Sequence, residues 1–284
     1  MTSSAVPIQP LPAADAPLPR YESYSSLTTY EACPRRYAFR YVERLPGEVR
    51  PGQFAFGSAV HKAFEIFVRG RIRARADGAP PPGLDTLQRA CDDVLARAGL
   101  EPDELEQARA RAVPVLARFL EREAACPSIP VAVELGFGVD VAIPGEVAPP
   151  TSTVRLVGYV DRVDRCPDGA TEVLDYKTGR PRPQADVDAD RQLTAYAYAS
   201  ARGALCDPAT GETLPPASRL GLYFADSGVE VATRRTPEQL AEFERDLLVM
   251  AGRVRQREFD ANPDARRCRW CEHRSLCPEA RRDD

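Results

Sequence analysis

Apolar and polar residues repeat with two different periods along this chain, and the first of these periods is helical. Apolar residues that recur every three or four positions are typical of amphipathic helices. This pattern predicts four helices, at 27–42, about 57–74, about 84–98 and about 103–124. Ser25 or Ser26 is expected to cap the first helix, and the Pro-Pro-Pro-Gly run at 80–83 ends the second.

Beyond residue 130 the period changes to two, which is typical of a half-buried strand. An apolar row alternates there with smaller or polar residues, and Glu134 falls on the opposite face. The row consists of Val131, Val133, Leu135, Phe137, Val139 and Val141. Further strands are predicted at 154–165, 171–178, 218–225 and 228–234, and helices at about 188–203 and from Pro237 to Arg257 with Thr236 as the cap. These elements predict an α/β fold, a mixed sheet flanked by helices with a helical insertion at about 84–126.

Length and composition are those of a globular protein with one large core or two small ones, since 43% of the 284 residues are hydrophobic and 28% are charged. No stretch approaches the roughly 18 apolar residues of a membrane span. Residues 1–20 are rich in proline and alanine and lack the pattern of a signal peptide. We therefore expect a disordered tail at 1–20, a single domain at 21–284 and a cytoplasmic location.

Four of the eight cysteines have a spacing that suits a metal centre. Cys268, Cys271 and Cys277 lie close together, and Cys33 stands alone in a compact aromatic segment. Four thiolates can hold an iron–sulfur cluster or a structural zinc. Because zinc sites usually present two paired knuckles, the remote fourth ligand favours a [4Fe-4S] cluster that joins segments at about 25–44 and 266–279. Disulfides are the weaker alternative, and the other four cysteines are interpreted as structural.

The charge of the protein is compatible with a local basic patch that binds nucleic acid, but not with a broad cationic surface. A net charge of −4 argues against nonspecific binding over a broad cationic surface. Arginines nevertheless flank the cysteines, and the alternative is that they are ordinary solvated side chains. They are Arg35, Arg36, Arg40 and Arg44 in the first segment and Arg266, Arg267, Arg269 and Arg274 in the second.

An acidic centre is predicted in the two strands that surround the turn at 167–169. Asp175 and Lys177 are two residues apart and share one face of a strand, and Asp161 on the neighbouring strand can face them. Carboxylates suit Mg²⁺ or Mn²⁺, and an adjacent lysine can orient or deprotonate water and offset charge on a phosphate. A surface ion pair is the alternative interpretation of the Asp-x-Lys tripeptide alone.

The order of five motifs resembles a known nuclease module. His61 in FAFGSAVHKAFE is followed by Glu134, GYVDRVD, DYKTG and the QLTAY segment at 192–196. Over about 21–280 the chain resembles the RecB-type exonucleases of the PD-(D/E)XK superfamily. Its cysteines match the iron–sulfur branch of that group, which includes AddB-type nucleases and CRISPR-adaptation exonucleases.

The resemblance implies roles for individual residues. His61, Asp161, Asp175 and the carbonyl of Tyr176 would bind the metal, and Lys177 would be the catalytic lysine. Gln192 and Tyr196, one helical turn apart, would border the site and support substrate placement. Glu134 either approaches the site or faces solvent, and His273 inside the cysteine loop is expected to be incidental.

The function expected from these features is a metal-dependent DNA exonuclease in repair, recombination or related processing, with a structural cluster. Alternatives are a catalytically silent DNA-binding or scaffold subunit of a helicase–nuclease complex, and a zinc-stapled endonuclease. The sequence has no G-x-x-x-x-G-K-[ST] phosphate loop. The protein is therefore expected to act on accessible single-stranded or duplex DNA ends, or to work with a helicase partner.

Overall fold

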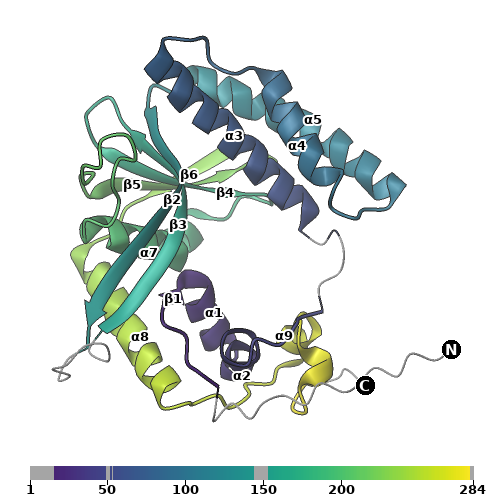
Figure 1. Ribbon diagram of the computed structural model, residues 1–284, viewed down its shortest axis with the longest axis vertical. Coiled ribbons are helices and arrows are strands. Elements are labelled where there is room, and N and C mark those ends of the chain that lie inside the picture. The colour runs from purple at the N-terminus through teal and green to yellow at the C-terminus, as the bar shows by residue number, and fades with distance from the viewer. Residues whose placement is uncertain (1–15, 49–51, 53, 144–152, 282–284) are drawn as a thin grey trace. The chain divides into compact units, whose positions relative to one another are not determined.

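The computed structural model describes residues 16–48, 52, 54–143 and 153–281. Most of the expected disordered tail at 1–20 lies outside these residues. The chain forms two compact units. Figure 1 labels the helices and strands. Unit 1 comprises 1–49, 140–157 and 244–284, and unit 2 comprises 50–139 and 158–243. The single domain expected over 21–284 remains a prediction.

Three long helices of unit 2 match the sequence pattern closely. They are α3 (Ala55–Asp77), α4 (Leu84–Leu95) and α5 (Pro102–Ala125), and they lie side by side in Figure 1. α3 ends at Gly78, whose φ of 64° is a left-handed conformation that glycine adopts at little cost. α5 begins with a capping box between Glu101 and Glu104 and with Pro102 in the first turn. The predicted insertion at about 84–126 is thus confirmed as helical.

The sheet is mixed, as predicted. Its strands are β1 (Glu22–Ser23), β2 (Ile129–Ala142), β3 (Thr153–Arg165), β4 (Thr171–Lys177), β5 (Ala217–Phe224) and β6 (Val229–Thr233). They run in the order β1-β3-β4-β5-β6, and β2 also pairs with β3. β4 pairs antiparallel with β3, with Arg162 opposite Leu174, and parallel with β5, with Asp175 opposite Leu222. β4 therefore lies between two neighbours, where its side chains are almost all buried.

The apolar row predicted in β2 is only partly correct. Glu134 has a φ of 48°, a left-handed conformation that is uncommon for a residue other than glycine. Ala132 and Val133 are both buried, and regular alternation with Phe137 and Val139 inward begins only after Glu134. An irregularity at Glu134 explains this result, because one residue out of register moves the following side chains to the other face.

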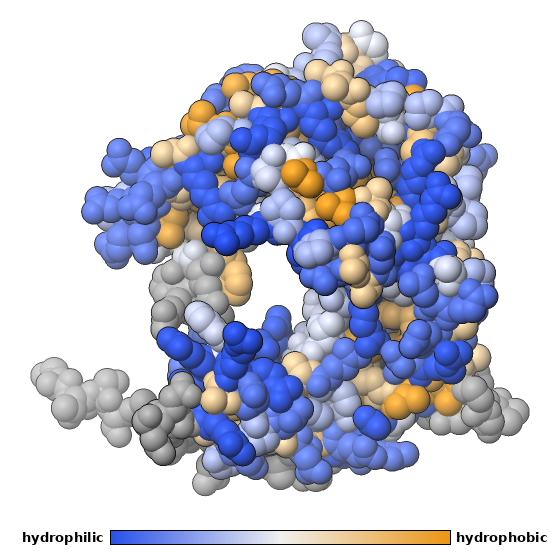
Figure 2. All heavy atoms as spheres, turned by 180° about the vertical axis from the view of Figure 1, so that it is seen from behind, coloured by the Kyte–Doolittle hydropathy of each residue, from blue (hydrophilic) through white to orange (hydrophobic). Residues whose placement is uncertain are grey.

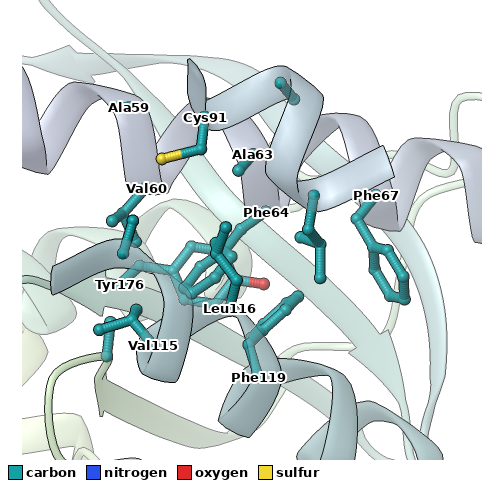
Figure 3. Close-up of a cluster of buried hydrophobic side chains, with 14 of the residues drawn as sticks. Ala59, Val60, Ala63, Phe64, Phe67, Cys91, Val115, Leu116, Phe119 and Tyr176 are labelled. Atoms are coloured by element: carbon teal, nitrogen blue, oxygen red, sulfur yellow. The ribbon is translucent and has the colours of Figure 1, made fainter. Parts of the chain in front are cut away.

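The core of unit 2 is aromatic and joins α3 to the sheet (Figure 3). Phe64 of α3 stacks on Phe119 of α5 with a centroid distance of 3.7 Å, and the ring of Tyr176 from β4 meets Phe64 edge-on at 5.0 Å. Phe67 adds a further edge contact to Phe119. Each buried aromatic side chain contributes about 1.5–3 kcal/mol of hydrophobic free energy. This packing fixes α3, and with it His61, against β4.

The helix predicted at about 188–203 is confirmed as α7 (Arg191–Ala201). A short helix that was not predicted, α6 (Gln184–Asp188), precedes it. Asp190 separates them, and its carboxylate accepts the Leu193 N–H at 2.9 Å as the cap of α7. α8 (Pro237–Arg255) follows the prediction, with Thr236 and Gln239 making the reciprocal bonds of a capping box.

Unit 1 contains the N-terminal helices, and the single helix predicted at 27–42 is wrong. The structure has α1 (Tyr24–Ala32), α2 (Pro34–Tyr37) and a π-helical turn, η1 (Ala38–Val42). Cys33 is extended because Pro34 disfavours helical backbone in the residue before it. The cap is Ser23, not Ser25 or Ser26, although Ser26 returns the second bond of the capping box. α9 (Ala265–Arg269) and the short 3₁₀ helix η2 (Arg274–Leu276) complete the unit.

A buried charge network, which the sequence pattern did not predict, ties α5 to β3. Arg162 is fully buried and donates to Glu123 and, at 2.6 Å, to Asp164. Arg71 and Arg122 also pair with Glu123. Removing one partner of such a network leaves a buried charge uncompensated.

We predict that Arg162→Met will lower the free energy of unfolding by about 3–5 kcal/mol. Urea denaturation of the purified variant measures this loss. Arg89→Ala is the control, because Arg89 pairs with Asp85 at the surface, and such exposed pairs contribute only about 0–1 kcal/mol. Equal stability of the two variants would contradict the assigned role of Arg162.

In the described ranges, no helix has the length and apolarity needed to cross a membrane. On the face shown in Figure 2, hydrophilic residues predominate and hydrophobic residues form separate patches.

Candidate active site

The candidate active site lies where the ladder between β3 and β4 ends. Arg162 and Leu174 are the last paired residues on this side. One residue further, the carboxylate of Asp161 takes over as acceptor, and its Oδ2 receives the Tyr176 N–H at 2.8 Å. By continuation of the register, Asp161 stands opposite Asp175, so that two carboxylates face each other across the end of the ladder.

A ring of polar contacts holds Asp175 and Lys177 against α7. Lys177 Nζ lies 2.5 Å from Asp175 Oδ2 and donates to Gln192 Oε1 at 2.8 Å. Gln192 Nε2 donates to the Tyr196 hydroxyl at 2.7 Å, and that hydroxyl donates to Asp175 Oδ1 at 3.2 Å. Burial raises the pKa of Tyr196, which keeps this donor protonated. Gln192 and Tyr196 therefore orient the acidic and basic groups from one face of α7.

His61 enters the site from the opposite side, on α3. Its Nδ1 lies 3.5 Å from Asp161 Oδ2, and its ring meets the ring of Tyr176 edge-on at a centroid distance of 6.0 Å. Burial lowers the pKa of His61, which favours the neutral imidazole that binds metals. Tyr176 is buried in the core through its side chain, so only its backbone is available to the site.

The electrostatics of the site call for a cation. Burial raises the pKa of Asp161 to about 8, and the charge of Asp175 adds to the rise. Burial also raises the pKa of Glu134, with smaller contributions from the charges of Glu65 and Asp175. Glu134 thus belongs to the same electrostatic environment as the two aspartates, and its backbone is left-handed. Strained backbone conformations are often found near functional sites.

The donor set fits a hard divalent cation, because carboxylate oxygens and a neutral imidazole are suitable ligands. Asp175 Oδ2 is buried and, although close to Lys177 Nζ, has no hydrogen bond of good geometry. Among the residues that the structure describes, no three His, Cys, Asp or Glu side chains already converge tightly enough to hold an ion.

The four cysteines singled out in the sequence line one cavity of unit 1. Its volume is about 250 Å³, and Cys33, Cys268, Cys271 and Cys277 all contribute to its wall. All four are free thiols. Burial raises the pKa of Cys271 and raises that of Cys277 to about 11. Unlike these four, Cys91 is packed in the core of unit 2 and Cys166 is buried elsewhere.

His273 has a packing role that sequence reasoning missed. Its side chain is buried, and its ring lies 5.6 Å from that of Phe39. The neighbouring Glu272 accepts a hydrogen bond from Arg36 Nε at 2.8 Å. The segment between Cys271 and Cys277 is therefore anchored on the N-terminal helices. A histidine in an arginine-rich loop gives no periodic signal from which this burial could be predicted.

A sequence comparison places the candidate site within a known family. The profile of the PD-(D/E)XK nuclease superfamily matches residues 22–278. The chain belongs to this superfamily. The match covers both compact units, so the cysteine-lined cavity and the acidic site lie within the same family region.

Two solved structures resemble this PD-(D/E)XK protein. The crystal structure of SSO0001 is 13% identical, with a TM-score of 0.38 over 81% of this chain and 97% of the other. The crystal structure of a "Putative exonuclease" from Eubacterium rectale is also 13% identical, with a TM-score of 0.44 over 93% of this chain and 91% of the other. No curated protein matches the sequence.

The raised pKa of Asp161 leads to a prediction for the metal-free protein. Between its ordinary pKa of 3.8 and about 8, Asp161 holds a proton in the folded state that the unfolded state has released. Stability therefore falls as the pH rises through this window. In EDTA, we expect the Tm of the parent to decrease from pH 5 to pH 9, and Asp161→Asn to reduce this decrease.

Asp85→Asn is the matched control for this experiment, because Asp85 is exposed on α4 and its side chain pairs with Arg89 at the surface. This variant should keep the pH dependence of the parent. Added Mn²⁺ should raise the Tm of the parent most at high pH, where Asp161 is ionised. An identical Tm profile for Asp161→Asn and the parent would show that Asp161 is not the titrating group.

Proposed function

We propose that the protein is a Mg²⁺- or Mn²⁺-dependent DNA exonuclease that acts in repair, recombination or related processing. The observation that carries the proposal is the facing pair of the buried Asp175 and the half-buried Asp161, which lie beside His61 and Lys177 at the end of one ladder. A surface ion pair would not be buried in this way, nor would it be held by two side chains from a helix. The superfamily match supports nuclease chemistry at these residues.

Each residue has a definite role in this proposal. His61, Asp161, Asp175 and the carbonyl of Tyr176 would hold the divalent cation, which when bound supplies charge neutralisation and an acidified water. Lys177, fixed by Gln192, would orient or deprotonate the attacking water and offset charge on the phosphate. Tyr196 holds Asp175 in place through its hydroxyl. In this proposal the phosphate is placed first. The oxygen of the water then bonds to phosphorus as the bond from phosphorus to the leaving sugar oxygen breaks, and the proton of the water passes to Lys177 in its neutral form, while solvent protonates the leaving oxygen.

The cysteine-lined cavity is proposed to hold a [4Fe-4S] cluster, as in the iron–sulfur, AddB-like branch of RecB-type nucleases. The support is that Cys33, which lies 235 residues before Cys268 in the sequence, lines the same cavity as the three clustered cysteines. Phosphodiester hydrolysis transfers no electrons, so the cluster would be structural. It would staple the N-terminal helices to the C-terminal segment and present their arginines to DNA.

A helicase partner is proposed only for the unwinding of duplex DNA, since this sequence has no phosphate loop. The rival function is a silent DNA-binding or scaffold subunit. The ring that holds Asp175, Lys177, Gln192 and Tyr196 favours the enzyme, because a binding module has no need of a lysine held against a buried carboxylate.

The test is incubation of anaerobically purified protein with end-labelled linear DNA and with closed circular DNA, in Mg²⁺, Mn²⁺ or EDTA. Degradation of linear single strands or duplex ends in either metal, with circles intact, is the expected result. Cutting of circles would indicate an endonuclease. Binding of DNA without any hydrolysis in Mg²⁺ or Mn²⁺ would support the scaffold instead.

A further inference from the structure

A second cavity, which lies in unit 2, adjoins the acidic site and has no role in the chemistry described above. Its volume is about 540 Å³, and His61 forms part of its wall. The other described residues around it come from the start of α3, from α5 and from the residue after β4; they are Gly52, Phe54, Phe56, Gly57, Ser58, Arg111 and Thr178. Pockets of this size are in the range that binds small organic groups. A molecule bound in this cavity would lie next to His61, which is a proposed ligand of the metal ion.

An exposed aromatic ring stands at this cavity. Phe54 is 66% exposed, among the most exposed large hydrophobic residues that the structure describes. Phe56, two residues on, is half-buried. Exposed phenylalanine loses the hydrophobic free energy that burial would provide. A ring left in water beside a catalytic site is available to stack on a flat ligand.

Arg111 is held in a defined plane at the same cavity. Its guanidinium lies 3.8 Å over the ring of Phe56, and its Nε and Nη2 donate to the two carboxylate oxygens of Asp226 at 2.9 Å each. The side chain nevertheless remains 51% exposed. Because Asp226 already offsets the charge, Arg111 is poorly suited to neutralise a phosphate. A pre-oriented guanidinium plane is well suited to stack on a base.

Polar groups complete the cavity. Ser58 and Thr178 both line it, and each carries a hydroxyl that can donate or accept a hydrogen bond. Gly57 lets the start of α3 approach the residue after β4, since a Cβ atom at Gly57 would lie 3.1 Å from Thr178 Oγ1. Thr178 directly follows Lys177, and His61 also lines the cavity. The cavity therefore adjoins the acidic site at both its lysine and its histidine. Aromatic and hydroxyl groups of this kind match a nucleobase.

We propose that this cavity binds one unpaired nucleobase of the DNA strand being cut, stacked on Phe54 and the plane of Arg111. The proposal rests on the proposed function, since it places the base beside the phosphate that reaches His61. A base inside a duplex is already stacked on its neighbours and cannot enter, so the cavity selects unpaired ends. Arg111 belongs to the helical insertion, which therefore contributes to substrate selection.

The test uses single-stranded oligonucleotides that carry one 2-aminopurine at successive positions from the end, bound in Ca²⁺ buffer, with kinetics measured separately in Mg²⁺. In the parent, stacking should quench the fluorescence at one position near the end. Phe54→Leu and Arg111→Ala should lose this quenching and weaken single-strand binding about tenfold each, since stacking on a base contributes about 1–3 kcal/mol. KM should rise by a similar factor while kcat changes little.

Controls separate stacking from other effects. Phe54→Tyr keeps an aromatic face and should restore quenching. Arg109→Ala removes an arginine of the same helix that also pairs with one aspartate, Asp92, but does not line the cavity. This variant should behave as the parent. Circular dichroism and Tm identify any variant that fails to fold, and Phe54→Leu, at an exposed position, remains informative if Arg111→Ala is unstable.

The failures of the two proposals are distinguishable, because fluorescence reports binding without hydrolysis. A parent that quenches 2-aminopurine but cuts no DNA would support the base-binding cavity and contradict the nuclease. A parent that degrades single strands, with quenching and KM unchanged in both Phe54→Leu and Arg111→Ala, would overturn the cavity alone. If Phe54→Leu and Arg111→Ala lost affinity equally for blunt duplex DNA and for single-stranded DNA, the base-binding cavity would also be overturned.

Discussion

Lys177→Ala is expected to reduce the rate of DNA hydrolysis by about 10²–10⁴-fold, the usual contribution of a positioned proton-transfer group. The physical reason is that Lys177 is the basic group in direct contact with Asp175 and is fixed by Gln192. Initial rates on end-labelled linear DNA at saturating Mg²⁺ measure the effect. The free energy of unfolding should change little, since the lysine side chain is partly exposed.

Substitution by arginine sharpens this experiment. Lys177 and Lys62 are the only lysines in a sequence that otherwise uses arginine for its basic residues. Arginine keeps the charge but cannot give up its proton in a protein, whereas a lysine can. Lys177→Arg should therefore also be strongly impaired. Lys62→Arg is the matched control, because Lys62 forms a surface pair with Glu65, and it should retain the parental rate. Full activity of Lys177→Arg would exclude a proton-transfer role for Lys177.

Cys33→Ser is expected to remove the iron–sulfur cluster as completely as Cys271→Ser. A cubane cluster carries about four irons per chain, and in this proposal each iron is held by one of the four cysteines, so that either substitution leaves one iron without its thiolate. Iron analysis and the visible absorption of anaerobically purified protein measure the loss. Cys126→Ser and Cys206→Ser are matched controls, because these two half-buried cysteines lie away from the cavity.

The loss of the cluster should also lower stability. Linking Cys33 to Cys268 closes a long loop in the unfolded chain, which on the model-dependent entropic estimate for a covalent cross-link stabilises by up to about 5 kcal/mol. The Tm and the affinity for DNA should therefore fall together in Cys33→Ser. One equivalent of zinc and a colourless parent would contradict the cluster, and a parental Tm after loss of the cluster would contradict the staple.

Much of the fold could be predicted because the sequence patterns are strong. α3, α4 and α5 carry long amphipathic repeats, and β3 and β4 alternate around a turn, so both types of element were predicted to within a few residues. The same alternation placed Asp161, Asp175 and Lys177 together. Short motifs in a fixed order were enough to predict the family.

The parts that were missed depend on tertiary contacts or local strain. The irregularity at Glu134 interrupts an apparently regular apolar row, and the periodicity gives no sign of it. Arg162 carries a charge, and nothing in the sequence pattern marks it as buried, yet Glu123 and Asp164 compensate it in the core. Pro34 was available as a signal that the first helix is broken at Cys33, because proline restricts the residue before it.

The most direct test of a metal-dependent nuclease site at Asp161 and Asp175 is the rate of hydrolysis of end-labelled linear DNA as Mn²⁺ is titrated, in the parent and in Asp175→Asn. We expect no hydrolysis in EDTA, a saturable rise with Mn²⁺ in the parent, and little or no rise in the variant at any concentration. Hydrolysis by the parent in EDTA, or the same titration curve for the parent and Asp175→Asn, would contradict the site.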